Sequence, residues 1–197
     1  MTEAPVVCRS VIDRPEEKRA SVGKILSNIS AKVVDLDSKK ALGPNMPGEL
    51  FIKGPHVMAG YFKNKEATEE SFEDGWFRTG DVVYYDEEGY VYIVDRIKDM
   101  IKVKGYQVAP TELEDVIRTV PGVKDVAVIG IRDEKAGEVP KAFIVRASED
   151  VKEEHIHKFL DDKLAKYKKL SGGIVFLEEL PKSPTGKVLR KELRKMD

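Results

Sequence analysis

The spacing of apolar residues changes close to residue 96, and this change limits the possible folds more than any other feature of the sequence. Before it, short apolar runs alternate with turn residues, which is the pattern of a β-rich unit. After it, strand-like runs alternate with helical periodicity, as in residues 151–167, where one face carries Ile156, Phe159, Leu160, Leu164 and Tyr167. We therefore predict an α+β chain with a β-rich unit over residues 1–96 and a compact α+β unit over residues 97–197.

The expected elements follow from these patterns and from turn and capping residues. Residues 1–30 are poorly periodic and are expected to form an extended loop with little core of its own. We predict strands at 31–36, 48–53, 82–86, 90–95, 99–103, 123–132, 140–147 and 173–177. Helices are predicted at 64–72, with Asn64 as the cap, and at 110–120, 151–167 and 188–196. In the second helix, Thr111 and Glu114 have the spacing of a capping box.

Composition and charge restrict the class of protein. The chain has 197 residues, of which 41% are apolar and 35% charged, as in a soluble globular protein. A net charge of −1 argues for neither nucleic acid nor an anionic membrane as the main partner. Residues 1–96 carry 13 Lys and Arg against 17 Asp and Glu, whereas residues 97–197 carry 21 against 18. The first unit therefore has a net charge of −4 and the second a net charge of +3. A positively charged unit suits a domain that closes over a bound polyphosphate.

Cysteine usage and the termini bear on location. The single cysteine, Cys8, cannot form an intrachain disulfide, which fits a reducing compartment. We find no apolar run long enough to span a bilayer, no signal-peptide pattern and no Ser-Lys-Leu ending, since the last three residues are Lys195-Met196-Asp197. The expected location is intracellular, either cytoplasmic or peroxisomal.

Three segments carry residues suited to nucleotide chemistry, and each also has a simpler interpretation. In Thr79-Gly80-Asp81, a carboxylate after a glycine turn can accept hydrogen bonds from a ribose diol, or it can cap the next strand. Residues 94–110 place several basic groups and Gly105 where they can meet anionic oxygens, although an edge strand protected by lysines has the same pattern. The loop 181–187 ends in Lys187 but lacks the Walker phosphate-loop pattern, because Val188 follows the lysine.

The order and spacing of these segments resemble the adenylate-forming superfamily, which includes acyl-CoA synthetases, 4-coumarate–CoA ligases and beetle luciferases. The matching motifs are GELFIKG at 48–54 with Gly60-Tyr61, RTGD at 78–81, the stretch 95–110 and the lysine loop 181–187. The phrases AKVVDLD and IKVKGYQVAPTELED resemble the 4-coumarate ligase and luciferase branch. The resemblance covers essentially the whole chain.

The resemblance implies a two-step reaction and assigns roles by position. ATP and a carboxylic acid would give an acyl-adenylate and pyrophosphate, and coenzyme A would then displace AMP. Thr2 would contact the AMP phosphate, and Glu3 would help to hold ATP and its Mg²⁺. Asp81 and Arg96 would hold the ribose hydroxyls.

The second unit would be a mobile lid that turns about Lys98. Lys187 would act in adenylation, as a cation between two anionic reactants. After rotation, Lys102 and Gln107 would face the acyl-adenylate, with Gly105 and Tyr106 beside coenzyme A. Because Lys102 and Lys187 come from separate segments, we expect them on different faces of the lid.

The resemblance also implies that part of the enzyme lies elsewhere. Met1-Thr2-Glu3 resembles the end of a motif of the large domain, and the family's phosphate loop and acid pocket would lie upstream. We therefore expect residues 1–96 to be the C-terminal part of the large AMP-binding domain and the chain to be inactive alone. A luciferase-like monooxygenase and a freestanding, non-catalytic lid module remain as alternatives. The acid substrate and the oligomeric state are not predicted.

Overall fold

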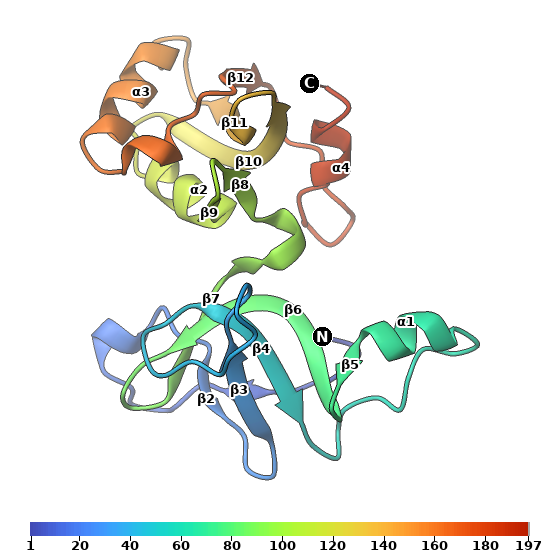
Figure 1. Cartoon of the computed structure of the whole chain (residues 1–197). Coiled ribbons are helices and arrows are strands. Elements are labelled where there is room, and N and C mark those ends of the chain that lie inside the picture. Colours follow the sequence, from blue (N-terminus) through green and yellow to red (C-terminus); the bar gives the residue numbers. More distant parts are fainter. Residues whose placement is uncertain (197) are drawn as a thin grey trace. The chain divides into compact units, whose positions relative to one another are not determined.

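The computed structural model describes residues 1–196, which form two compact units (Figure 1). The first is Met1–Lys98 and the second begins at Asp99, so the division falls inside a short 3-10 turn, Ile97–Asp99. Each unit combines a β-sheet with short helices, and the predicted α+β class is confirmed.

The first unit is built on one antiparallel sheet with the strand order β1-β2-β7-β6-β4-β3, and β5 pairs with β6. Its strands are β1 (Cys8–Arg9), β2 (Gly23–Ile25), β3 (Ser30–Val34), β4 (Gly48–Lys53), β5 (Phe72–Glu73), β6 (Trp76–Tyr85) and β7 (Tyr90–Arg96). Helix α1 (Lys65–Glu70) begins where predicted, because the Asn64 side chain accepts a hydrogen bond from the Ala67 N–H at 3.0 Å.

The expectation that residues 1–30 form an extended loop with little core of their own is wrong. Strand β2 pairs with β7 from the same sheet, and Ala4 is fully buried in the core of the unit. Gly23 makes the close approach possible: a Cβ there would lie 1.8 Å from the carbonyl oxygen of Arg9, and its φ is +98°. Strands of two or three residues that pair with a distant strand leave no periodic signal in the sequence.

The second unit is built on a sheet with the order β10-β11-β8-β9, and β12 joins β11 as a parallel neighbour. Its strands are β8 (Ile101–Val103), β9 (Tyr106–Val108), β10 (Val123–Asp133), β11 (Gly137–Arg146) and β12 (Ile174–Leu177). Its helices are α2 (Pro110–Arg118), α3 (Glu153–Asp161) and α4 (Arg190–Leu193).

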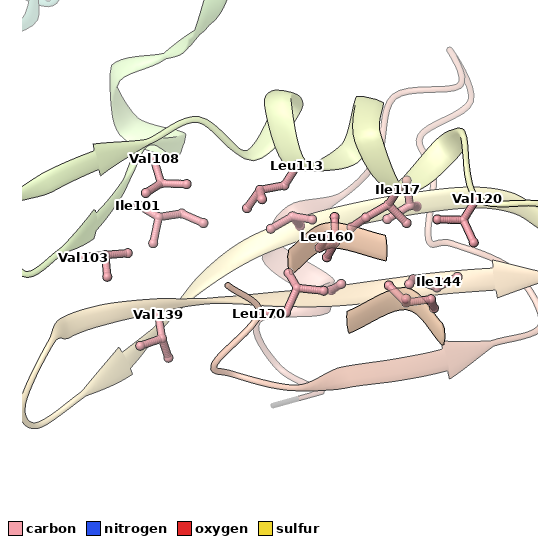
Figure 2. Close-up of a cluster of buried hydrophobic side chains, with 14 of the residues drawn as sticks. Ile101, Val103, Val108, Leu113, Ile117, Val120, Val139, Ile144, Leu160 and Leu170 are labelled. Carbon is pink, nitrogen blue, oxygen red and sulfur yellow. The ribbon is translucent and has the colours of Figure 1, made fainter. Parts of the chain in front are cut away.

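Two apolar cores lie on opposite faces of the β10–β11 pair. Val126 and Val128 belong to the larger core, in which Leu113 and Ile117 of α2 and Leu160 of α3 meet Ile144 of β11 (Figure 2). The intervening residues Ala127 and Ile129 belong to the smaller core, together with Phe143, Leu180 and Leu193. Because side chains alternate along a strand, the two sets point to opposite sides. The smaller core seats α4 and the base of the loop 181–187.

Two helices are shorter than predicted, and one cap differs. Helix α3 ends at Asp161 and is followed by a separate 3-10 turn at Lys166–Lys168, and α4 covers only Arg190–Leu193 with Leu189 as its N-cap residue. No side chain caps α2 at its N-cap residue, Ala109. Glu114 instead turns into the unit and bonds to Val128 and Arg190, so the predicted capping box is wrong.

Candidate functional site

The first unit contains a cleft of about 660 Å³. Residues of β6, β7, α1 and the N-terminal segment are among those that line it. Most of its lining side chains are polar or charged. The lining residues are Met1, Glu3, Glu49, Tyr61, Glu70, Ser71, Phe77, Arg78, Thr79, Gly80, Asp81 and Arg96. Three of the four predicted nucleotide-binding residues therefore share one cleft, whereas Thr2 is exposed and is not among its lining residues.

Asp81 and Arg96 face each other directly across β6 and β7. Their side chains form an ion pair of 3.1 Å, and Arg96 Nη2 donates to the carbonyl of Thr79 at 3.4 Å. Strand β6 begins at Trp76, so this motif lies within a strand and not in a turn before one, as the capping interpretation required. Gly80, immediately before Asp81, has a φ of +69°, a backbone conformation that residues other than glycine rarely adopt.

Glu3 is held at the other side of the cleft. Its Oε1 accepts a hydrogen bond of 3.0 Å from the Tyr61 hydroxyl. Bonds from its own backbone N–H and from Tyr61 lower the pKa of the Glu3 carboxyl. Tyr61 belongs to a recognised motif, but its contact with Glu3, 58 residues away, gives no signal in the sequence.

A buried ion pair supports the floor of the cleft and was not predicted. Glu49 of β4 is only 3% exposed, and its Oε2 accepts a 3.1 Å bond from Arg78 of β6. Next to Arg78, Thr79 Oγ1 donates to the carbonyl of Leu50 at 2.9 Å and accepts from the Asp81 N–H at 3.1 Å. This network ties β4 to the strand that carries Asp81.

In the second unit, β8 and β9 form a hairpin with a two-residue turn. This hairpin carries the residues that are predicted to act in thioester formation. Lys102 and Gln107 are cross-strand neighbours, and both are exposed. The turn residues Lys104 and Gly105 have φ values of +49° and +85°, and a Cβ on Gly105 would have no heavy atom within 4 Å. Space beside Gly105 is thus open to a ligand.

Tyr106 follows this turn and is fixed by a ring contact. It is 58% exposed, and its ring stacks on Tyr167 with centroids 4.5 Å apart and planes at 17°. Lys168, next to Tyr167, pairs with Glu112 of α2 through both carboxylate oxygens. The hairpin is thereby connected to the segment after α3.

Lys187 ends a loop with a closed base. The Ser183 N–H donates to the carbonyl of Lys187 at 2.8 Å, and the Leu189 N–H donates to that of Pro181 at 2.8 Å. Gly186 has a φ of +82°, which turns the chain back. The Lys187 side chain is exposed and has no ion-pair partner within residues 1–196, so its amine is available to a ligand.

Lys102 and Lys187 belong to different parts of the second unit. The loop 181–187 is tied by Lys182 to Asp125, at the start of β10, with 2.6 Å between the charged atoms. Strand β8 meets β11 at Gly137, which is at the opposite end of the β10–β11 pair.

Lys98 is exposed and lies in the turn where the two units divide.

The carboxylates of the described residues do not form a metal cage. Within residues 1–196 no group of three or more His, Cys, Asp or Glu side chains is placed to hold a metal ion. A Mg²⁺ ion held mainly by nucleotide phosphates would need only one or two protein carboxylates, and the cleft offers Glu3 among others. Among the same residues, no helix is long and apolar enough to cross a membrane.

Comparisons with known proteins agree on one family. The AMP-binding enzyme model matches residues 1–62, and the AMP-binding enzyme C-terminal domain model matches residues 112–187. The chain is 44% identical over its full length to a 4-coumarate–CoA ligase-like protein of Arabidopsis thaliana, of which it covers 35%. It is also 44% identical, over 95% of its length, to a luciferin 4-monooxygenase of Nipponoluciola cruciata, of which it again covers 35%.

A solved structure supports the same assignment. The ATP-bound crystal structure of MatB from Rhodopseudomonas palustris superposes with a TM-score of 0.85 at 37% identity, over 90% of this chain and 35% of that one. Fold and matches together indicate the AMP-binding enzyme family. The chain belongs to the adenylate-forming superfamily, as its motifs predicted, and spans about a third of the length of the curated relatives it matches.

Proposed function

We propose that this chain is the C-terminal portion of an ATP-dependent carboxylic acid–CoA ligase. Residues 1–96 would complete the large AMP-binding domain, and residues 97–197 would form a mobile lid that turns about Lys98. The observation that carries the proposal is the convergence of Glu3, Asp81 and Arg96 on one cleft. The names of relatives agree with it, among them 4-coumarate–CoA ligase 1 of Narcissus pseudonarcissus and a peroxisomal OPC-8:0-CoA ligase of Arabidopsis thaliana.

The first half-reaction is adenylation. A carboxylate oxygen attacks the α-phosphorus of ATP, a new O–P bond forms, and the bond to the β-phosphate oxygen breaks to release pyrophosphate. Asp81 accepts hydrogen bonds from the ribose hydroxyls and Arg96 holds Asp81 in place, which fixes the nucleotide. Glu3 holds the Mg²⁺ that accompanies ATP, and Thr2 contacts the α-phosphate. Lys187 lies between the two anionic reactants and stabilises the charge of the transition state.

The second half-reaction is thioester formation. The sulfur of coenzyme A attacks the acyl carbon, a C–S bond forms, and the C–O bond to AMP breaks while the thiol proton passes to solvent. Lys102 and Gln107 face the acyl-adenylate, and Gly105 and Tyr106 border the pantetheine arm. The open space at Gly105 supports this assignment. Lys102 and Lys187 sit at separately anchored parts of one unit, which supports their use in different lid positions.

Substitution of each lysine in the complete ligase tests the division of labour. Lys187→Ala is expected to slow adenylation by about 10²–10³-fold, by analogy with a lost transition-state donor, and to spare thioester formation from a supplied acyl-adenylate. Lys102→Ala is expected to do the reverse. Pyrophosphate release and thioester formation, measured separately, report the two steps. Equal slowing of both steps by either variant would refute the assignment.

One other function is distinguished by a simple assay. The match to luciferin 4-monooxygenases supports a luciferase-like monooxygenase as the alternative, and such an enzyme would emit light with luciferin, ATP and oxygen.

We expect the 197-residue chain by itself to release no pyrophosphate from ATP with aromatic or fatty acids, since the family's phosphate loop is not in its sequence. Robust turnover by this chain alone would contradict the proposed C-terminal portion.

A further inference from the structure

One buried carboxylate in the second unit takes no part in the mechanism above. Glu114 of α2 is 5% exposed, and burial raises the pKa of its carboxyl. Its Oε1 accepts a 2.9 Å hydrogen bond from the Val128 N–H of β10 and a 2.7 Å bond from Arg190 Nη2. Arg118, one turn further along α2, lies 3.6 Å from Oε2. A buried carboxylate with this many donors holds its neighbours in a fixed arrangement, because leaving any of them unpaired is costly.

Arg190 connects this carboxylate to the lysine loop. It begins α4, three residues after Lys187, and its Nε also donates to the carbonyl of Val128 at 3.4 Å. Val128 and Glu114 therefore bind the same guanidinium from two sides. Arg190 is thereby held against α2 and β10, two elements that pack on each other.

The loop has a second anchor on its other side. Lys182 pairs with Asp125 at 2.6 Å, and Leu180 is buried in the smaller core beside Leu193. The Leu189–Pro181 backbone bond closes the base between the anchors. Of these anchors the Lys182 pair is half exposed, whereas the Glu114 pair is buried, so the Glu114 pair holds more firmly.

We propose that Glu114 is a positioning residue for Lys187. Glu114 holds Arg190, and Arg190 in turn holds the loop 181–187 in the position that adenylation requires. The inference rests on the proposed function. A displacement of about 1 Å in a catalytic group can slow a reaction by roughly 10²-fold. A contact that only stabilises the unit would instead affect both half-reactions alike.

The test uses Glu114→Gln in the complete ligase, since glutamine keeps the shape and accepts from Val128 but loses the charge that holds Arg190. We expect adenylation to slow by about 10–100-fold and thioester formation from supplied acyl-adenylate to stay within about twofold. Arg190→Gln is expected to have the same effect, and the double variant to be no slower than either single one, because the two residues act as a unit. Asp115→Asn, which removes an exposed ion pair from the same helix, is the matched control and should change neither step.

A second measurement is independent of activity. In the 197-residue chain, Glu114→Gln is expected to speed amide exchange at Ser183, Gly186 and Leu189, whose N–H groups close the loop, and to leave Val103 and Tyr106 of the hairpin unchanged. Uniform loss of protection across the unit, or equal slowing of both half-reactions, would overturn the positioning role. If Lys187→Ala slows adenylation and Glu114→Gln does not, only this inference fails. If Lys187→Ala has no effect, the proposed function fails.

Discussion

Single charged residues of this chain differ in energetic weight because they differ in burial. The pairs Lys65–Glu69 and Glu192–Lys195 are exposed, and such pairs contribute at most about 1 kcal/mol each. Glu49 and Glu114 are nearly enclosed, and removing the partner of such a group costs on the order of 3–5 kcal/mol. Each of these carboxylates binds an arginine that lies three residues from a proposed functional residue in the sequence, Arg78 from Asp81 and Arg190 from Lys187. The two buried carboxylates, whose charge is costly to bury, thus hold arginines that are close in the sequence to residues whose position the proposed chemistry depends on.

Asp86 gives a prediction at this scale. Although partial burial alone raises the pKa of its carboxyl, bonds from Lys18 Nζ, the Tyr90 N–H and the Tyr92 hydroxyl lower it to about 2. The unfolded value is about 3.9, so the folded state binds the proton less tightly. The stability that Asp86 contributes is therefore present above about pH 4 and lost as the pH falls toward 2.

We expect Asp86→Asn to lower the urea midpoint of the first unit at pH 7 and to flatten its fall between about pH 4 and 2. Asp37→Asn, in the neighbouring turn 35–40, serves as an exposed control. Unfolding curves followed by Trp76 fluorescence at several pH values give the measurement. An unchanged acid slope in the Asp86 variant would contradict the prediction.

At the scale of elements, two short segments of the second unit carry the proposed chemistry and are held in different ways. The loop 181–187 is held by ion pairs at both ends and by the smaller core. The β8–β9 hairpin is held by its ladder to β11, by Ile101, Val103 and Val108 in the larger core, and by the Tyr106–Tyr167 stack. Because the supports are separate, damage to one segment should leave the other intact.

Removal of the ring stack tests this separation. Tyr167→Ala in the complete ligase is expected to slow thioester formation by about fivefold or more, since an aromatic pair contributes about 0.5–1.5 kcal/mol beyond its buried area and its loss frees the hairpin turn. Adenylation should change by less than about twofold. Tyr167→Phe keeps the ring and is the matched control, expected to behave as the parent. Slower adenylation with normal thioester formation would be the opposite result and would rule out this role.

At the scale of the whole molecule, the chain consists of two units with separate cores. The core of the first unit includes Val33, Leu50, Ile52 and Phe77, and the cores of the second lie on the two faces of β10–β11. None of the three clusters contains buried residues from both units. A chain with this organisation can unfold in two steps, since neither core needs the other for its packing.

We expect residues 99–197 to fold by themselves and to melt cooperatively. In the 197-residue chain, Leu160→Ala should destabilise the second unit by about 2–5 kcal/mol and leave the unfolding of the first unit unchanged. Amide dispersion in NMR spectra and thermal melting of the isolated segment test the first statement. Residue-resolved hydrogen exchange tests the second. A broad, non-cooperative melt of residues 99–197 would show that the unit depends on the preceding residues.

Much of the architecture was readable from local patterns. Alternating apolar residues predicted β4, β7, β10 and β11, the Asn64 cap marked the start of α1, and the motifs at 78–81, 95–110 and 181–187 predicted the family. These features depend on residues close together in the chain, where periodicity and turn chemistry act directly. The same reasoning missed β1, β2, β5 and β9, and it extended α3 and α4 too far, because short strands and helix ends are decided by distant partners.

The sequence by itself determined the class of fold, the family and the identity of the residues that could do chemistry. Only the tertiary structure decided which of these residues meet. It brought Glu3 to Tyr61 and both to the cleft of Asp81 and Arg96, and it left Thr2 outside the lining. It also made Glu114 the hydrogen-bond acceptor for Arg190, whereas the sequence suggested that Glu114 takes part in a capping box. The physical reason is that a buried polar group must find its partners within the packed core, and contacts between residues far apart in the chain leave no mark on local spacing.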